Sequence, residues 1–280
     1  MNRCRAMSLR TDNVRFLELI SYDASTNELT TKLISDGQSL YNALWNGTSL
    51  SARILGKELD RGVVRSRMRE IGAWLRLYHD SSDHAGAFEE VAEHLNEDLE
   101  RKVATVRQNE LVSEYLLTRI ETFCRIQFSQ IRDPLYRESN HVRLCRVQGD
   151  FIASNMLTDP QWKIVVGDFA DTHIGASTED VGRFCEQLLA LSRCGVFRGE
   201  VFSEAIREFL QGYGVDGLYF EKSPFCKAII FLNGLISAIS EMKARPFIAR
   251  QLLTRYELKR LVRATLGWIA LDLGKSARSE

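Results

Sequence analysis

The sequence predicts a mixed α+β fold in which a short strand-rich segment precedes a long, mainly helical region. Residues 14–34 are rich in β-branched and aromatic side chains and are interrupted by a turn at 23–27. Residues 61–79 place apolar side chains at alternating steps of four and three, as amphipathic helices require, and two further helical segments extend to residue 131. Short apolar runs follow between residues 142 and 167, and the helical pattern returns after Ser177.

The first elements are a strand pair and a short helix. Val14–Asp23 and Glu28–Ile34 have the composition of strands, and residues 35–37 break the second one. Ser39 is placed to cap a short helix that runs through Trp45. These residues predict a small sheet followed at once by a helix.

Three longer helices are then expected. In Arg61–His79 one stripe is apolar, and its members are Val64, Met68, Ile71, Leu75 and Tyr78. A polar, acidic helix is expected over Ala87–Val106 and another over Leu111–Ile131, which Asp133-Pro134 should end.

Short strands and further helices complete the prediction. The strands are expected at Val142–Val147, Met156–Thr158 and Trp162–Gly167. Residues 177–180 resemble a capping box in which Asp180 replaces the usual Glu or Gln. A helix that starts near Val201 should stop at Gly212 and Gly214. Residues 226–242 are apolar but short and interrupted by polar side chains, so we expect a buried helix there.

Charge and cysteine usage exclude several classes of protein. The 280 residues include 37 basic and 37 acidic ones, whereas nucleic acid and anionic membranes attract a basic excess, so neither partner is expected. The six cysteines form no C-x-x-C pair, which argues against a zinc site. Scattered cysteines of this kind are typical of reduced, buried thiols, and the N-terminus lacks the apolar core of a secretory signal, so we expect a cytoplasmic protein.

The residues that carry chemistry lie between positions 147 and 180. Apolar runs there separate Asp150, Asn155 and Asp168. Phosphorylation of a hydroxyl needs one carboxylate to orient the hydroxyl and take its proton. It also needs a second carboxylate and an amide oxygen to hold the magnesium ion that neutralises the phosphates. These three residues suit that division of roles.

Two motifs resemble those of a known family. G-D-F-I-A-S-N at 149–155 resembles the catalytic loop H-G-D-x-x-x-x-N of the aminoglycoside phosphotransferase and small-molecule kinase family, a relative of the protein-kinase loop. D-F-A-D at 168–171 resembles the D-F-x-D element of that family, and the residues between match the hairpin that joins the two motifs. The resemblance extends over residues 14–191 and implies a protein-kinase-like fold with a reduced N-terminal lobe.

The resemblance implies roles for five residues. Asp150 would be the catalytic base, and Asn155 and Asp168 would bind magnesium. Gln148, which stands where the family usually has His, and Asp180 would be structural residues at the site. ATP and magnesium are therefore the expected cofactors.

The resemblance also places the nucleotide, the acceptor and the domains. The hinge backbone would meet the adenine at Lys32, Leu33, Ile34 and Ser35. Asp171 would face the acceptor, which is expected to be an aminosugar, a sugar or an amino alcohol. Residues 1–38 would be a remnant of the N-terminal lobe and hinge, and residues 39–280 a C-terminal catalytic lobe with a helical acceptor-binding subdomain.

The sequence departs from the family pattern upstream. It contains no G-x-G-x-x-G upstream of the catalytic-loop motif, and residues 1–13 leave no room for a phosphate loop and a strand lysine. The chain is then an N-terminally truncated enzyme or a degenerate member, and we expect it to turn over poorly as it stands. The alternative function is a catalytically inactive kinase-like binding or scaffold protein, against which the retention of all three site residues argues.

Simpler interpretations remain for single residues. Asp168 could be a turn-capping carboxylate, and His173 a solvated loop residue. His79 is expected to act as a cation at a helix C-terminus rather than as a catalyst. Lys32 is expected at a sheet edge or on the surface.

Overall fold

The structure, a computed structural model, describes residues 13–16, 19–23, 28–31, 37–48, 54, 59–82, 87–108, 113–193 and 199–243. The chain divides into two compact units, and each is discontinuous in sequence. Unit 1 comprises residues 1–85 and 144–219, and unit 2 comprises residues 86–143 and 220–280. Residues on both sides of position 38 belong to unit 1, and the predicted domain boundary there stays a prediction.

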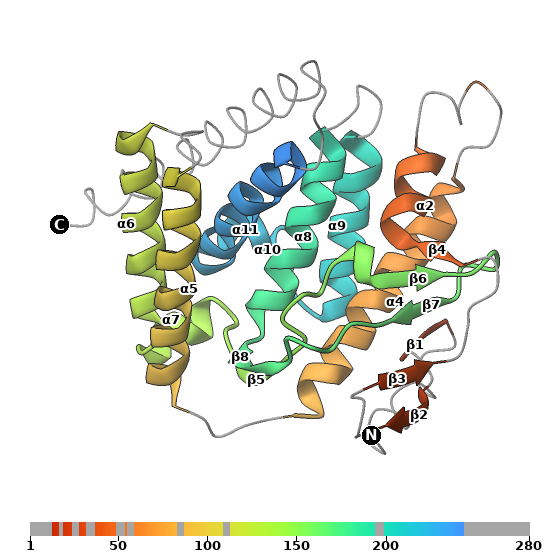
Figure 1. Ribbon diagram of the computed structural model, residues 1–280, viewed down its shortest axis with the longest axis horizontal. Coiled ribbons are helices and arrows are strands. Elements are labelled where there is room, and N and C mark those ends of the chain that lie inside the picture. The colour runs from red at the N-terminus through yellow and green to blue at the C-terminus, as the bar shows by residue number, and fades with distance from the viewer. Residues whose placement is uncertain are drawn as a thin grey trace. The chain divides into compact units, whose positions relative to one another are not determined.

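Unit 1 contains a four-stranded sheet in the order β1-β7-β6-β4 (Figure 1). Its strands are β1 Val14–Phe16, β4 Gln38–Ser39, β6 Met156–Thr158 and β7 Ile164–Val166. β6 and β7 form an antiparallel hairpin in which Met156 lies opposite Val166. β1 runs parallel to β7, and β4 runs antiparallel to β6. The sheet therefore joins the N-terminal strands to the hairpin between the two predicted motifs.

The predicted single strand over Val14–Asp23 is wrong, because the chain forms two strands there. β1 ends at Phe16, and β2 Leu19–Asp23 pairs with β3 Glu28–Thr31 in a separate antiparallel hairpin. The partner of β1 lies about 150 residues later in the sequence, so a local pattern could not reveal the change of partner. The predicted adenine contacts, Lys32 to Ser35, lie outside the described residues.

Two helices follow the strands of unit 1 as predicted. In α2, Leu40–Gly47, Ser39 is the N-cap, and its Oγ accepts from the Asn42 amide at 3.1 Å. In α4, Arg61–Asp80, the Asp60 carboxylate accepts from the Gly62 amide at 2.7 Å. The whole predicted apolar stripe of α4 is buried. At the end of this helix Ser82 Oγ accepts from the Arg146 amide at 2.9 Å, which ties α4 to the strand that precedes the site.

The remaining elements of unit 1 surround the predicted catalytic loop. They are β5 Leu144–Val147, the 3-10 turn η1 Ala153–Asn155, β8 His173–Ala176, α8 Thr178–Arg193 and α9 Gly199–Tyr213. The predicted strand over 142–147 is confirmed from Leu144 onward. β8, which the sequence analysis did not predict, pairs antiparallel with β5 and places Val147 opposite His173.

Helices α4 and α9 pack closely through glycines. A side chain at Gly72 would collide with the carbonyl of Phe209, and one at Gly212 would collide with the carbonyl of Arg69. Gly212 therefore lies inside α9 as a packing residue, and the prediction that it stops the helix is wrong. Gly214, with a φ of +90°, follows the helix end as predicted.

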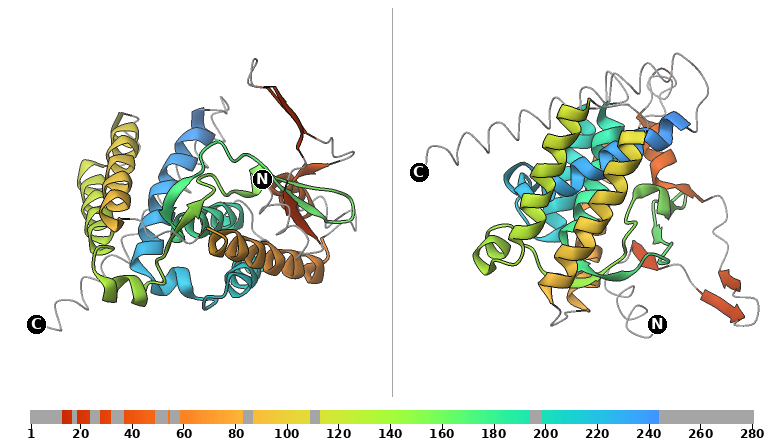
Figure 2. Two further views of the ribbon diagram at one scale, coloured as in Figure 1. Left: turned by 90° about the horizontal axis from the view of Figure 1, so that it is seen from below. Right: turned by 60° about the vertical axis from the view of Figure 1, so that its left-hand side comes forward.

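Unit 2 is built from helices α5 Phe88–Gln108, α6 Glu114–Gln130, α7 Pro134–Ser139 and α11 Pro224–Lys243. The short helix α10, Tyr219–Lys222, spans the point where the chain passes from unit 1 to unit 2. α5 and α6 lie side by side, and α11 packs against both (Figure 2). The helix predicted over residues 226–242 is confirmed, and its described side chains, up to Asn233, are buried.

Pro134 both follows α6, as predicted, and opens α7, which the sequence analysis did not predict. Asp133 caps α7 by accepting from the Leu135 amide at 2.9 Å. Across the described ranges, no helix is long and apolar enough to cross a bilayer.

Candidate active site

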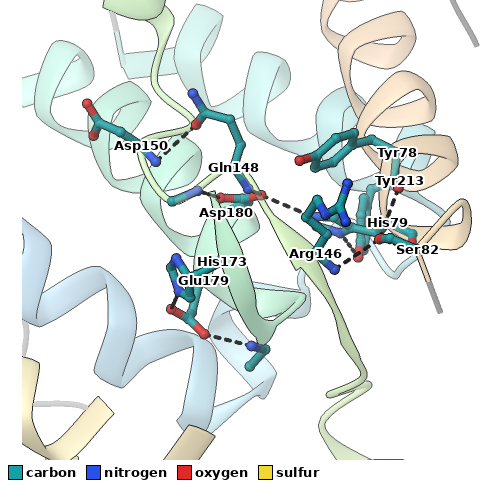
Figure 3. A network of polar contacts seen from close by, with 12 residues as sticks. Tyr78, His79, Ser82, Arg146, Gln148, Asp150, His173, Glu179, Asp180 and Tyr213 are labelled. Carbon is teal, nitrogen blue, oxygen red and sulfur yellow. Dashed lines mark hydrogen bonds and ion pairs between the residues drawn. The ribbon is translucent and has the colours of Figure 1, made fainter. Parts of the chain in front are cut away.

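The segment that follows β5 is held at its start by a buried carboxylate. Asp180, in the first turn of α8, is fully buried. Its Oδ2 accepts from the Gln148 amide at 2.7 Å, and its Oδ1 accepts from the Gly149 amide at 2.9 Å (Figure 3). Gly149 has a φ of +85°, and a side chain there would collide with the Asp171 carbonyl. The chain therefore turns sharply at Gly149, and the backbone position of Asp150 is fixed by these contacts.

These contacts correct the interpretation of residues 177–180 as a capping box. Asp180 does not reach back to its own helix start but bonds the loop after β5. Glu179 makes the local contact instead, since its Oε1 accepts from the Ala176 amide at 2.6 Å. A pattern of residue types could not distinguish the two because both carboxylates lie in the first turn of α8.

Behind Asp180 lies a buried polar chain from α4 and α9. Nε2 of His79 lies 3.0 Å from Asp180 Oδ2, and Nδ1 of His79 lies 2.8 Å from the Tyr213 hydroxyl (Figure 3). An ionised carboxylate only accepts hydrogen bonds, so Nε2 carries the proton shared with Asp180. His79 lies in the last turn of α4, as predicted, but is only 1% exposed, and its positive charge stays a prediction.

Asp150 is held at both carboxylate oxygens. Asn155 Nδ2 donates to Asp150 Oδ2 at 2.8 Å and to the Asp150 carbonyl at 3.0 Å. Arg183 Nε donates to Asp150 Oδ1 at 2.6 Å, and Arg183 Nη2 forms an ion pair with the same oxygen at 2.5 Å. The side chains of Arg183 and Asp150 are 27% and 23% exposed, so the pair remains within reach of a ligand.

Gln148 connects the catalytic-loop motif to the D-F-A-D motif. Its Oε1 accepts from the Asp150 amide at 3.0 Å (Figure 3). Its Nε2 donates to the carbonyl of Gly167 at 3.2 Å and to the carbonyl of Asp168. One buried side chain thus bonds the backbone on both sides of the candidate site.

Asn155 and Asp168 lie at the paired ends of the β6–β7 hairpin. The Gly167 amide donates to the Asn155 carbonyl at 3.1 Å, and Asp168 comes directly after it. Asp168 is exposed and has a φ of +55°. The Asn155 amide nitrogen faces Asp150, so its oxygen lies on the opposite side of the amide. The assignment of both residues as magnesium ligands stays a prediction.

The donor set suits magnesium bound together with a nucleotide. No group of three or more His, Cys, Asp or Glu residues is arranged to hold a metal within the described parts of the chain. Magnesium is often bound by one or two protein oxygens together with substrate phosphates and water. The amide oxygen of Asn155 and the carboxylate of Asp168 are hard oxygen donors of that kind.

Asp171 and His173 lie at the turn into β8. Asp171 is exposed, and its carbonyl accepts from His173 Nδ1 at 2.8 Å. His173 Nε2 lies 3.4 Å from Glu179 Oε2 (Figure 3). The hydrogen bond with Glu179 raises the pKa of His173 to about 9, and burial of the ring opposes this shift. His173 lies in strand β8 and is paired with Glu179, so the expectation of a solvated loop residue is wrong. The acceptor contact of Asp171 stays a prediction.

The sequence analysis missed two residues of this site, Arg183 and Gln187. Gln187 accepts from the Ala153 amide at 2.5 Å and donates to Ser154 Oγ at 2.6 Å. Together with Asp180 they lie at spacings of three and four on α8, next to the apolar stripe. Polar side chains at helical spacing, in the helix that begins with the predicted Asp180, were the signal that could have revealed them.

Solved structures share this fold, although no protein-family profile and no curated protein match the sequence. A glucosamine kinase in complex with glucosamine, ADP and inorganic phosphate superposes with a TM-score of 0.60 at 13% identity, over 95% of this chain and 72% of that one. A glucosamine kinase structure in another crystal form superposes with a TM-score of 0.62 at 14% identity, over 95% of this chain and 70% of that one. An ethanolamine kinase from Plasmodium vivax gives 0.50 at 13% identity, over 94% and 73%. The expected kinase-like fold with a reduced sheet lobe is therefore confirmed.

Proposed function

We propose that this chain, which has the fold of glucosamine kinase, transfers the γ-phosphate of ATP to a hydroxyl of a small molecule. The observation that supports the proposal best is the arrangement around Asp150. A half-buried carboxylate is fixed by Asn155 and by a backbone that Asp180 holds, and Gln148 links it to the segment of Asp168. Such positioning is most of what a phosphotransferase must supply.

In this proposal Asp150 is the general base. It accepts a hydrogen bond from the acceptor hydroxyl and receives its proton as the bond to phosphorus forms. Magnesium, when bound with ATP, would neutralise charge on the phosphates, and Asn155 and Asp168 would hold it. Asp180 and Gln148 keep the backbone of both motifs in place.

The acceptor class we propose is an aminosugar, a sugar or an amino alcohol. The names of the structures with the same fold, glucosamine kinase and ethanolamine kinase, support small hydroxyl compounds that carry an amine.

Calorimetric titration of Mg-ATP tests the nucleotide site. Asp168→Ala should abolish magnesium-dependent binding, because it removes the proposed ligand. Asp150→Ala should bind Mg-ATP with nearly unchanged affinity and lose phosphate transfer, because it removes the general base and leaves the proposed magnesium ligands in place. Equal affinity of the wild type and Asp168→Ala would contradict the ligand assignment.

A panel of aminosugars, sugars and amino alcohols tests the reaction. Formation of ADP that depends on one acceptor and is lost in Asp150→Ala supports the proposal. The alternative is a kinase-like binding or scaffold protein. A wild-type chain that binds neither Mg-ATP nor any acceptor would favour that alternative.

A further inference from the structure

The charged partner of Asp150 comes from α8 and was not part of either motif. Arg183 donates from Nε to one carboxylate oxygen, Oδ1, at 2.6 Å, and its Nη2 forms an ion pair with the same oxygen at 2.5 Å. Asn155 Nδ2 occupies the other oxygen, Oδ2, at 2.8 Å. A guanidinium is always protonated, and hydrogen bonds between ionised partners are roughly twice as strong as neutral ones. The orientation of the Asp150 carboxylate is therefore fixed before any ligand binds.

The distribution of these bonds makes the two oxygens of Asp150 unequal. An ionised carboxylate offers about four lone-pair positions, two on each oxygen. Two nitrogens of Arg183 lie against Oδ1, one through a hydrogen bond and one through the ion pair, whereas Asn155 donates one hydrogen bond to Oδ2. The position that is left for an acceptor hydroxyl lies on Oδ2, beside the amide of Asn155.

The position of Arg183 is itself fixed by the helix that carries it. Asp180, three residues earlier, bonds the loop at Gln148 and Gly149. Gln187, four residues later, bonds it at Ala153 and Ser154. The loop is thus attached to one face of α8 on both sides of Asp150, and Arg183 lies between the two attachments.

We infer that Arg183 is a positioning residue that engages Oδ1 of Asp150, so that the acceptor hydroxyl is presented to Oδ2. This inference rests on the proposed phosphotransferase function. In the step, the hydroxyl O–H bond breaks and its proton goes to Oδ2, while the oxygen forms a bond to the γ-phosphorus. The bond between that phosphorus and the bridging oxygen breaks, and its electron pair leaves with ADP.

The chemical reason for such a clamp is orientation. A free aspartate side chain samples several rotamers, and most of them point the carboxylate away from a bound hydroxyl. Loss of alignment by about 1 Å can lower a rate by about 100-fold without any loss of substrate binding. Removal of Arg183 should therefore reduce kcat and leave the Michaelis constants nearly unchanged.

The kinetic test compares Arg183→Met, Arg183→Lys and the control Arg61→Met, whose arginine is 57% exposed and lies 3.9 Å from Glu200. With the best acceptor of the panel, Arg183→Met should lower kcat about 10- to 100-fold. KM for ATP and for the acceptor should stay within about twofold. Arg183→Lys, which keeps the charge but not the paired donors, should recover part of the loss. The control should keep the wild-type kcat.

Three kinetic outcomes would overturn the inference. A kcat of Arg183→Met within twofold of the wild type would show that Arg183 is not needed to position the Asp150 carboxylate. A loss confined to KM would assign Arg183 to binding. A rise in kcat would show that Arg183 blocks the base and must leave it during turnover.

A second measurement is independent of activity. In proton–nitrogen NMR spectra of the arginine Nε–H groups, the Arg183 signal is identified by its absence in Arg183→Lys. It should shift and exchange faster with solvent in Asp150→Asn, because the carboxylate partner is lost. An unchanged signal would reject the contact whatever the kinetics show. A wild type that transfers to no acceptor would reject the proposed function, while this measurement would still decide whether Arg183 holds Asp150.

Discussion

Nε2 of His79 donates a 3.0 Å hydrogen bond to Oδ2 of Asp180, and neither side chain is exposed to solvent. The same carboxylate accepts two backbone amides from the loop that carries Asp150. The C-terminal turn of α4 is thereby connected through one carboxylate to the candidate site. Stability of the buried network and geometry of the site should depend on the same residue.

Asp180→Ala should strongly destabilise unit 1. The substitution leaves two backbone amides and the imidazole of His79 buried without their acceptor, which costs about 3–5 kcal/mol of unfolding free energy. Urea denaturation followed by circular dichroism measures the loss. Asp80→Asn is the matched control, because Asp80 forms a partly exposed ion pair with Arg76 and should contribute about 1 kcal/mol or less. A similar loss of unfolding free energy in both variants would contradict the claim that the buried contacts of Asp180 stabilise unit 1.

Gly149→Ala should reduce both stability and activity. The φ of +85° is unfavourable for a residue with a side chain, and the new methyl group would collide with the Asp171 carbonyl. We expect a loss of about 1–3 kcal/mol and a displaced Asp150. Gly199→Ala is the control, since a side chain at that exposed position meets nothing within 4 Å. Equal melting temperatures of the two variants would show that the turn tolerates a side chain.

The His173–Glu179 pair predicts a pH-dependent contribution to stability. The hydrogen bond with Glu179 raises the folded-state pKa of His173 from 6.5 to about 9. Because the folded pKa lies above the unfolded one, the pair stabilises fully below about pH 6.5, and the contribution is lost as pH rises to about 9. The ring is 32% exposed, so solvent screens the pair and the contribution should be about 1 kcal/mol or less.

The measurement compares the unfolding free energies of the wild type and His173→Gln at about pH 6 and about pH 9.5. The difference between them should be larger at the lower pH. In a Glu179→Gln background the pH dependence of this difference should shrink, because the partner charge is gone. A difference that grows toward high pH would have the wrong sign for this pair.

The buried cysteines should resist thiol reagents in the native state. Cys124, Cys145, Cys185 and Cys226 are buried, and burial raises the pKa of Cys124 to about 12 and also that of Cys226. The thiolate is the reactive form, so a protein that retains only these four should react slowly near pH 8 and completely in denaturant. A Cys4→Ser, Cys194→Ser double variant supplies that protein. Rapid native labelling of more than one thiol would contradict the packing.

Local chemistry was readable from the sequence where a single element decides it. The cap at Ser39 and the buried stripe of α4 depend on residues within one or two turns of helix, and both were predicted correctly. The resemblance of the motifs at 149–155 and 168–171 to those of a known family likewise indicated the kinase-like fold that solved structures share. Periodicity and motif spacing report such features because the relevant contacts are close in sequence.

Long-range contacts decided the rest. The pairing of β1 with β7, the burial of His79 against Asp180 and the ion pair of Arg183 with Asp150 join residues from 33 to 150 positions apart. The sequence does not distinguish a carboxylate or imidazole that caps a helix or is exposed to solvent from one that is buried against a distant residue. It likewise does not distinguish a glycine that ends a helix from one that packs against a distant backbone. The sequence by itself determined which groups are present, and the tertiary structure decided their partners, because burial and charge pairing depend on what the fold brings near.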